Sequence, residues 1–346
     1  MPHTVVLIPG DGIGPEVADA TRRILAAADA DIQWVERQAG LAALEAGAAS
    51  VLPDETVNAI LEYGVALKGP CTTPIGGGFS SINVALRKTL NLYGAVRPVR
   101  TLQGVTTRFE NVDLIVIREN TEGLYSGIEN IITPGPPEVI TSLKVATEVA
   151  CRRIARFAFN YALSRGRKKV TCLHKANIMK LTDGLFIRCA REEHEKSFSD
   201  KLVYDEMIID AACMRLVQDP TRFDVILCEN LYGDLISDLC AGLVGGLGVT
   251  PGANFGDEHA VFEAVHGSAP DIAGQNKANP LALLMSAVMM LRHLANTRND
   301  PRLTEVANRI RDAYNACLIA GEKTRDLGGT LGTREFADAV IARLTA

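Results

Sequence analysis

Short apolar runs alternate with helical patterns along most of the chain, and this alternation restricts the fold more than any other feature. The five clearest runs are Thr4–Ile8, Val65–Leu67, Leu114–Ile117, Val170–Leu173 and Val225–Leu227. Continuous apolar runs of this length are typical of strands buried on both faces, and strands separated by helices pair in parallel. The sequence therefore predicts an α/β fold with a largely parallel sheet. Function in such sheets usually lies just beyond the carboxyl ends of the strands.

Composition excludes several classes of protein. The chain has 346 residues, of which 47% are hydrophobic and 22% charged, and its net charge is −5. This composition is globular, and the length suits one large domain or two interleaved ones. A protein with a weakly negative net charge is a poor candidate for binding nucleic acid or an anionic membrane. The longest apolar stretches, near Leu239–Val249 and Leu281–Leu291, are far shorter than a membrane span.

The eight cysteines indicate a reducing compartment. None forms a Cys-x-x-Cys pair, and several, such as Cys172 and Cys228, lie in apolar runs. We expect buried free thiols. The apolar run Val5–Ile8 leads directly into a glycine turn and is too short for a secretory signal. The predicted location is the cytoplasm, or the mitochondrial matrix if a leader has been removed.

The turn IPGDGIGPEV, Ile8–Val17, resembles a dinucleotide-binding fingerprint only superficially. Its spacing is G-x-G-x-G-P, and Pro15 suits the first turn of a helix, predicted over Pro15–Ala28. A tight connection from strand to helix is therefore expected. A second irregular segment, Gly127–Glu138, is either a loop or a hairpin arm that contacts a partner subunit.

The segment TTPIGGGFSSINVALR, Thr72–Arg87, predicts an anion site. Three glycines, Gly76, Gly77 and Gly78, allow the backbone to approach a ligand closely. Ser80 or Ser81 is expected to cap a helix whose start attracts anions.

Asn83 and Arg87 lie four residues apart, on one face of that predicted helix. Arg97 follows in VRPVR, and Arg118 directly follows a predicted strand. A single arginine is most often a surface charge. Three arginines with a serine and an asparagine suit a small polycarboxylate, because guanidinium groups bind carboxylates in bidentate fashion.

Two carboxylates in NLYGDLISDL, Asp234 and Asp238, lie four residues apart on an expected helix. Like charges at this spacing repel unless a cation lies between them. Mg²⁺ or Mn²⁺ takes such oxygen ligands, and Asp210 is a plausible third. The alternative is a capped helix with solvated acids.

Lys175 and Tyr125 are candidate proton carriers. Lys175 lies just beyond the run Val170–Leu173, where burial or a neighbouring cation would suit it as a general base. Taken alone, it is more often a surface lysine, and Tyr125 is more often a packing residue.

The segment EAVHGSAPDIAGQNKANP, Glu263–Pro280, suits a loop around a nucleotide. Asp271 would hydrogen-bond a ribose 2′-hydroxyl and repel a 2′-phosphate, by ~4 kcal/mol at 4 Å and intermediate dielectric. The loop therefore favours NAD.

Taken together, these motifs resemble the β-decarboxylating dehydrogenases, which act on isocitrate, homoisocitrate, isopropylmalate or tartrate. The resemblance rests on IPGDGIGPEV, RENTEGLYSG, HKANIMK, NLYGDLISDL and HGSAPDIAGQNKANP and covers nearly the full length. It implies a two-domain, non-Rossmann α/β fold with an interdomain active-site cleft. The large, nucleotide-binding domain would comprise 1–98 and 248–346. The small domain, 99–247, would carry dimerisation, catalytic and metal residues.

The resemblance also implies a role for each candidate residue. Tyr125 and Lys175 would be catalytic, and Asp210, Asp234 and Asp238 would bind Mg²⁺ or Mn²⁺, with Lys175 and Asp210 supplied by the partner of a homodimer. Substrate would be bound by Ser81, Asn83, Arg87, Arg97 and Arg118. NAD would be bound by Thr72, Glu263, His266, Gly267, Ser268, Ala269, Pro270, Asp271, Ile272 and Asn279.

Two places decide between family members. Ser81 and Asn83 resemble the isocitrate enzymes, whereas isopropylmalate enzymes carry an apolar patch there. NADP-using isocitrate members have lysine and tyrosine in place of Asp271 and Ile272, and Thr324–Thr333 also resembles NAD-using relatives. The resemblance therefore implies NAD-dependent oxidation and decarboxylation of isocitrate, with homoisocitrate as the next substrate. A non-catalytic regulatory subunit is the alternative of another class.

Overall fold

The computed structural model describes residues 2–72 and 81–345. The chain forms two compact units. The first comprises Met1–Leu90, Thr101–Glu110 and Ala241–Ala346, and the second comprises Asn91–Arg100 and Asn111–Cys240. The predicted roles of two domains, nucleotide binding in one and dimerisation in the other, stay predictions.

In the first unit the strand order is β2-β1-β3-β12-β11. The strands are β1 (His3–Ile8), β2 (Ile32–Glu36), β3 (Val65–Lys68), β11 (Pro251–Phe255) and β12 (Ala260–Ala264). All neighbours pair in parallel except β11, which is antiparallel to β12. The helices are α1 (Gly14–Ala27), α2 (Leu41–Glu45), α3 (Asp54–Tyr63), α4 (Ile82–Thr89), α9 (Leu281–Thr297), α10 (Arg302–Ile319) and α11 (Thr333–Leu344).

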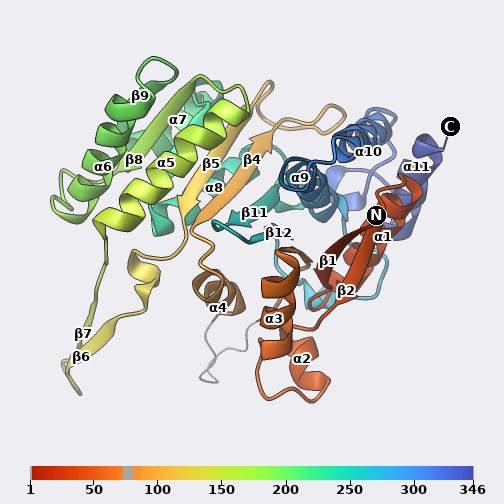
Figure 1. Cartoon of the computed structure of the whole chain (residues 1–346), viewed down its shortest axis with the longest axis horizontal. Coiled ribbons are helices and arrows are strands. Elements are labelled where there is room, and N and C mark those ends of the chain that lie inside the picture. The colour runs from red at the N-terminus through yellow and green to blue at the C-terminus, as the bar shows by residue number, and fades with distance from the viewer. Residues whose placement is uncertain (1, 73–80, 346) are drawn as a thin grey trace. The chain divides into compact units, whose positions relative to one another are not determined.

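In the second unit the strand order is β4-β5-β10-β8-β9. The strands are β4 (Gly94–Arg100), β5 (Asp113–Glu119), β8 (Lys169–His174), β9 (Val203–Ile208) and β10 (Val225–Cys228). Only the β4–β5 pair is antiparallel among these neighbours. The helices are α5 (Glu148–Ser164), α6 (Thr182–Ser197), α7 (Ile209–Gln218) and α8 (Asn230–Leu243), of which α5 and α6 lie in front of this sheet and α7 behind it (Figure 1).

The five apolar runs all form strands, and the predicted first helix is α1, so these predictions are confirmed. The strands are buried on both faces, as in β10, whose four residues are all buried. The prediction of a largely parallel sheet is also confirmed, with β4 and β11 as the antiparallel exceptions.

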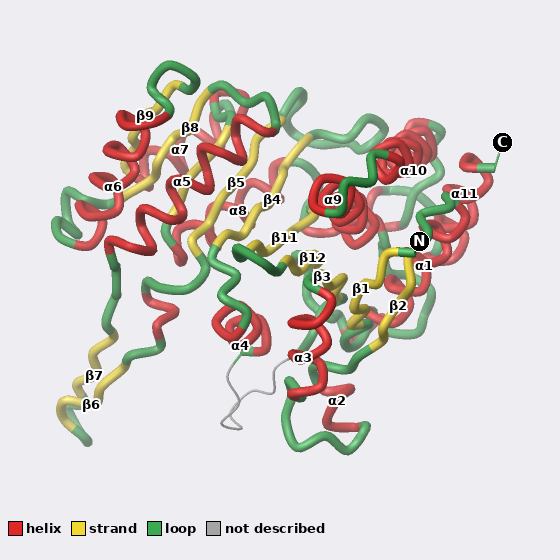
Figure 2. Tube along the Cα trace, in the orientation of Figure 1, coloured by secondary structure: helices red, strands yellow, loops and turns green. Residues whose placement is uncertain are grey.

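The segment that the sequence left open is a hairpin. Strands β6 (Glu129–Thr133) and β7 (Val139–Ser142) pair in antiparallel fashion and form a two-stranded sheet of their own. Figure 2 shows this hairpin as two short yellow strands at the end of two connecting segments. Every residue of both strands is exposed, including Ile131, Ile132 and Ile140.

All eight cysteines are free, and six of them are buried. Burial raises the pKa of the Cys228 thiol well above its usual value, which keeps it protonated and unreactive. Among the described residues, no helix is both long and apolar enough to cross a membrane.

Candidate functional site

The turn between β1 and α1 supports a neighbouring loop of the first unit. Pro15 lies in the first turn of α1, as the sequence predicted. Gly12 has a positive φ of 59°, and a Cβ on it would lie 2.0 Å from the Ser268 carbonyl oxygen. The Ile13 N–H donates to that same oxygen at 2.9 Å. Glycine is therefore required because the turn packs directly against the backbone of the predicted nucleotide loop.

Helix α4 presents two polar side chains with unsatisfied buried atoms. Ser81 is exposed and occupies the N-cap position, but its side chain makes no capping hydrogen bond, so the predicted cap is wrong for Ser81. Gly76, Gly77, Gly78 and Ser80 lie outside the described residues. Asn83 Oδ1 and Arg87 Nε are buried, and neither has a hydrogen-bond partner among the described residues. Buried polar atoms normally have partners, so these two atoms suit a polar ligand.

Arg87 belongs to a buried network of ion pairs in the first unit. Glu263 contacts Lys68 Nζ at 2.8 Å and Arg87 Nη2 at 3.2 Å, and it also accepts from Asn254 Nδ2 at 2.7 Å. Lys68, Arg87 and Glu263 are 2%, 7% and 7% exposed. Burial alone would raise the pKa of Glu263, but the charges of Lys68 and Arg87 hold it well below its usual value. Glu263 is therefore ionised and orients Arg87.

Arg118, Tyr125 and Asp234 form a compact cluster in the second unit. Arg118, 1% exposed, is the last residue but one of β5. It donates to Asp234 Oδ1 through Nη1 and to Asn230 Oδ1 through Nη2 at 2.7 Å. The Tyr125 hydroxyl donates to Asp234 Oδ2 at 2.6 Å, and its ring lies 5.0 Å from the Arg118 guanidinium. Gly233 makes this packing possible, since a Cβ there would lie 2.5 Å from the Arg118 Cβ.

Burial and the hydrogen bond to Asp234 raise the pKa of Tyr125, and Arg118 only partly offsets this rise. Tyr125 is therefore a neutral phenol at physiological pH and able to donate a proton.

Arg97 lies beside the second carboxylate of α8. Its Nη1 donates to Ser237 Oγ at 2.5 Å and to Asp238 Oδ1 at 3.0 Å, and its Nη2 lies 3.6 Å from Asp234 Oδ1. Burial and the neighbouring Asp234 raise the pKa of Asp238, against the effect of Arg97. Two carboxylates that repel each other in this way suit a hard divalent cation.

Lys175 and Asp210 pair with each other and not with that cluster. Lys175 Nζ lies 2.6 Å from Asp210 Oδ1, and the hydrogen bond lowers the pKa of Asp210. No group of three or more His, Cys, Asp or Glu side chains within the described part of the chain is placed to hold a metal ion. Asp234 and Asp238 alone would not complete the coordination of a hard divalent cation, which takes six or more oxygens.

The predicted nucleotide loop contains one buried nitrogen without a partner. His266 Nδ1 lies 3.0 Å from the Gly267 carbonyl oxygen, whereas Nε2 is buried and has no partner among the described residues. Burial lowers the pKa of His266, so the ring is neutral near pH 7. A neutral imidazole nitrogen in this position suits a hydrogen bond to a nucleotide.

Some of the other predicted nucleotide-binding residues make hydrogen bonds within the first unit, and others are exposed or half-buried. Thr72 Oγ1 contacts Ser268 Oγ at 2.5 Å, and Asn279 donates to Asp326 at 2.9 Å and accepts from the Leu281 N–H. Gly267, Pro270 and Asp271 are exposed, whereas Ala269 and Ile272 are half-buried.

The family model for isocitrate/isopropylmalate dehydrogenase matches residues 4–340. The chain belongs to this family. The resemblance inferred from the motifs, and the fold class that it implied, are therefore confirmed.

Individual relatives are similar over nearly the whole chain. One is the mitochondrial isocitrate dehydrogenase [NAD] catalytic subunit 5 of Arabidopsis thaliana, 49% identical over 99% of this chain and 89% of its own length. A mitochondrial protein of Dictyostelium discoideum that is named as a regulatory subunit of the same enzyme is 48% identical over 99% and 92%. The crystal structure of isocitrate dehydrogenase from Methylococcus capsulatus is 45% identical, with a TM-score of 0.93 over 99% of this chain and 100% of that one.

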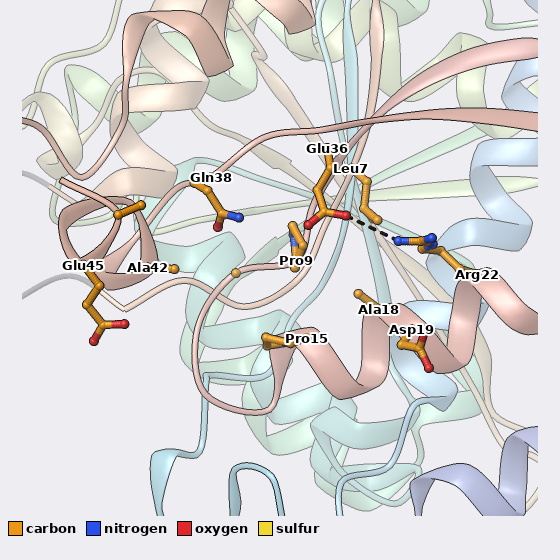
Figure 3. Close-up of a pocket in the computed structure, with 12 residues that line it drawn as sticks. Leu7, Pro9, Pro15, Ala18, Asp19, Arg22, Glu36, Gln38, Ala42 and Glu45 are labelled. Atoms are coloured by element: carbon orange, nitrogen blue, oxygen red, sulfur yellow. Dashed lines mark hydrogen bonds and ion pairs between the residues drawn. The ribbon is translucent and has the colours of Figure 1, made fainter. Parts of the chain in front are cut away.

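The first unit also contains a cavity that is separate from the predicted substrate and nucleotide residues. It measures about 360 Å³ and is lined by Leu7, Pro9, Pro15 and residues of α1, β2 and α2 (Figure 3). Arg22 and Glu36 face each other across its edge at 3.3 Å. None of the predicted site residues lines it.

Sequence reasoning missed several members of these networks. Lys68 lies at the carboxyl end of β3, much as Lys175 follows the carboxyl end of β8. This position at a strand end could have identified Lys68 as a candidate site residue. Asn230 and Ser237 lie within NLYGDLISDL beside the two predicted carboxylates. Lys144 forms a further set of ion pairs with Asp183 and Glu229 in the second unit. These three residues gave no comparable signal, because they come together only in the fold.

Proposed function

We propose that this chain oxidises isocitrate with NAD and decarboxylates it to 2-oxoglutarate and CO₂. The observation that carries the proposal is the cluster of Arg118, Tyr125 and Asp234, with Arg97 and Asp238 beside it. It combines fixed positive charge for carboxylates, a neutral proton donor and oxygen ligands for a cation. These are the groups that oxidation followed by loss of CO₂ requires.

Arg97 and Arg118 bind the malate part that all substrates of the family share. Both guanidinium groups are buried and held by α8 carboxylates and by Ser237 or Asn230. Guanidinium groups fixed in this way bind a carboxylate without further ordering.

Ser81, Asn83 and Arg87 recognise the third carboxylate of isocitrate. The unpartnered Arg87 Nε supports this role for α4, because it is a buried donor that still needs an acceptor. The amide nitrogen of Asn83 and the Arg87 guanidinium are the groups that would donate to that carboxylate.

Asp234 and Asp238 bind Mg²⁺ or Mn²⁺ together with oxygens of the substrate, and Asp210 of a partner subunit completes the set. Burial and the neighbouring Asp234 charge both raise the pKa of Asp238, and a cation between the two carboxylates would relieve their repulsion. When bound, the metal ion lowers the pKa of the substrate hydroxyl and stabilises negative charge on that oxygen.

Lys175 and Tyr125 move the protons. Lys175 relays the proton of the C2 hydroxyl. Its amine accepts that proton once the ammonium has passed one of its own to Asp210, with which it already shares a short hydrogen bond. After CO₂ has left, Tyr125 donates a proton to C3, for which its raised pKa suits it.

The first unit would hold NAD, which would supply the acceptor for the C2 hydride. His266 offers its unpartnered Nε2, and the exposed Asp271 accepts from a ribose hydroxyl. The nucleotide segment further comprises Thr72, Glu263, Gly267, Ser268, Ala269, Pro270, Ile272 and Asn279.

A second copy of this chain completes the assembly. The exposed apolar side chains of the β6–β7 hairpin support such an interface, among them Ile131, Ile132, Val139 and Ile140. Large exposed apolar surfaces usually mark contacts with other chains. The relatives are named as mitochondrial subunits, which favours an oligomer and favours the matrix over the cytoplasm.

NADH formation by the purified chain with isocitrate, NAD and Mn²⁺ tests the proposal. We expect activity without any second type of subunit, and catalytic efficiency highest for isocitrate among isocitrate, homoisocitrate and isopropylmalate. Lys175→Met should lower kcat by roughly 10²- to 10⁴-fold and leave the sedimentation behaviour unchanged. A preference for homoisocitrate would refute the substrate, and near-normal activity of Lys175→Met would remove Lys175 from the mechanism.

The 48% identity to a protein named as regulatory supports a second candidate function. A chain with that role would form no NADH alone but would change the activity of a catalytic subunit. The candidate catalytic side chains Tyr125, Lys175, Asp210, Asp234 and Asp238 are all present, which favours the catalytic role.

A further inference from the structure

Three charged side chains in the second unit, two of them buried and one half-buried, have no part in the function proposed above. Lys144 follows β7, Asp183 lies in the first turn of α6, and Glu229 directly precedes α8. Their side chains are 12%, 2% and 10% exposed. Each is connected to a segment that carries a proposed catalytic residue.

Asp183 connects Lys144 to the turn that carries Lys175. Lys144 Nζ donates to Asp183 Oδ1 at 2.6 Å, and the Lys175 backbone N–H donates to Asp183 Oδ2 at 2.7 Å. Both oxygens of one buried carboxylate are used, and charge-assisted hydrogen bonds of this length are strong. The place of the Lys175 backbone therefore depends on Asp183, whose orientation depends on Lys144.

Glu229 connects Lys144 to the start of α8. Lys144 Nζ lies 3.7 Å from Glu229 Oε1, and that oxygen accepts the Tyr232 backbone N–H at 3.0 Å. This acceptor satisfies one of the N–H groups that the first turn of a helix leaves unpaired. The ammonium also lies 4.6 Å from the centre of the Tyr232 ring, within cation–π distance. Burial raises the pKa of Glu229, and the Lys144 charge opposes that rise.

The backbone beside Lys144 is also tied to the loop of Tyr125. Gly123 and Val145 exchange hydrogen bonds of 2.9 and 3.2 Å, and Tyr125 follows in a 3₁₀ turn, Leu124–Ser126. The residue next to Lys144 is thus paired with the start of the loop that holds the proposed proton donor.

We propose that Lys144 is a positioning residue, which fixes the Lys175 turn through Asp183 and the start of α8 through Glu229. The inference rests on the proposed function, because it requires Lys175 and Asp234 to act on the substrate. One ammonium faces two buried carboxylates, and its removal leaves both without that counter-charge. Lys144 itself acts only through its neighbours and does not touch the reacting atoms.

Steady-state kinetics of the full chain test this inference. Lys144→Met and Asp183→Asn should each lower kcat by at least about tenfold while KM for isocitrate changes by less than about threefold, because the substrate-binding arginines are untouched. Lys144→Arg should recover most of kcat, since it restores the charge. The double variant should be no slower than the slower single variant, because Lys144 and Asp183 share the contact that fixes the Lys175 turn. The matched control is Lys196→Met, an exposed lysine on the same helix as Asp183, which should retain wild-type kcat.

Thermal unfolding of each variant separates positioning from stability. A loss of kcat that merely follows the unfolded fraction would overturn the inference, as would wild-type kcat in Lys144→Met. If Lys144→Met does not fold, Lys144→Arg and Asp183→Asn still test the inference. Wild-type kcat in Asp183→Asn would also overturn the inference. Near-normal turnover of Lys175→Met would instead refute the proposed function. An inactive Lys175→Met beside a normal Lys144→Met would refute only the role of Lys144.

Discussion

The Tyr125 hydroxyl donates a hydrogen bond of 2.6 Å to Asp234 Oδ2, so the proposed proton donor and a proposed metal ligand share one contact. The other oxygen of Asp234 faces Arg118. One carboxylate therefore links a phenol and a guanidinium. The phenol stays neutral because burial and Asp234 raise its pKa.

Tyr125→Phe should lower kcat by roughly 10²- to 10⁴-fold, because it removes the donor that protonates C3 after decarboxylation. The apolar ring stays, so packing on Arg118 is retained and KM for isocitrate should change little. NADH formation under saturating isocitrate, NAD and Mn²⁺ measures the effect. Tyr161→Phe, in the last turn of α5, is the matched control and should leave kcat unchanged. Equal kcat values for the two variants would exclude Tyr125 as the proton donor.

Glu263→Gln should destabilise the fold by about 3–5 kcal/mol, because it leaves Lys68 and Arg87 buried beside a neutral amide. The free energy of unfolding from urea titration measures this change. Glu322→Gln is the matched control, since Glu322 forms an ion pair with Arg343 in which the carboxylate is 42% exposed. Pairs near the surface contribute about 0–1 kcal/mol, so a similar loss in both variants would contradict the special role of the buried network.

The same network predicts how stability depends on pH. The folded pKa of Glu263 is held well below its usual value, whereas the unfolded chain titrates near about 4.3. The stabilisation is therefore complete above that pH and is lost as the pH falls from about 4.3 towards the folded pKa. In this range Glu263 alone should lower the free energy of unfolding by about 1.4 kcal/mol per pH unit.

Urea titrations of the wild type and of Glu263→Gln at several pH values measure this dependence. The difference between them should be constant from about pH 5 to pH 7 and should shrink below about pH 4.3. A difference that stays constant in acid would mean that Glu263 titrates alike in the folded and unfolded chains.

The parts of the fold that the sequence predicted are those set by local pattern. The run Leu114–Ile117 is apolar at every position and forms the centre of β5. Its neighbour β4 was missed because Arg97, Pro98 and Arg100 interrupt the apolar pattern, although its register with β5 is continuous.

The same distinction holds for the site. Asp234 and Asp238 could be predicted as a pair, since helical spacing places residues four apart on one face. The contacts of Glu263 with Lys68 and of Asp183 with Lys144 could not, because each joins elements that are distant in sequence. In the sequence these residues look like any surface charges. Only their burial in the fold, which removes water, makes an ion pair necessary for each of them.

Asp271→Lys combined with Ile272→Tyr should shift cofactor use from NAD towards NADP. Asp271 is exposed in the 3₁₀ turn Pro270–Ile272, so its carboxylate is free to approach a ribose and to repel a 2′-phosphate. Even half of the ~4 kcal/mol that two like charges at 4 Å experience at intermediate dielectric exceeds a tenfold preference. The ratio of kcat/KM for NAD to kcat/KM for NADP should therefore fall by at least roughly tenfold. Glu305→Lys, an equal charge change at an exposed position of α10, should leave the ratio unchanged. If both variants move the ratio equally, net charge explains the effect and Asp271 has no specific role in choosing the cofactor.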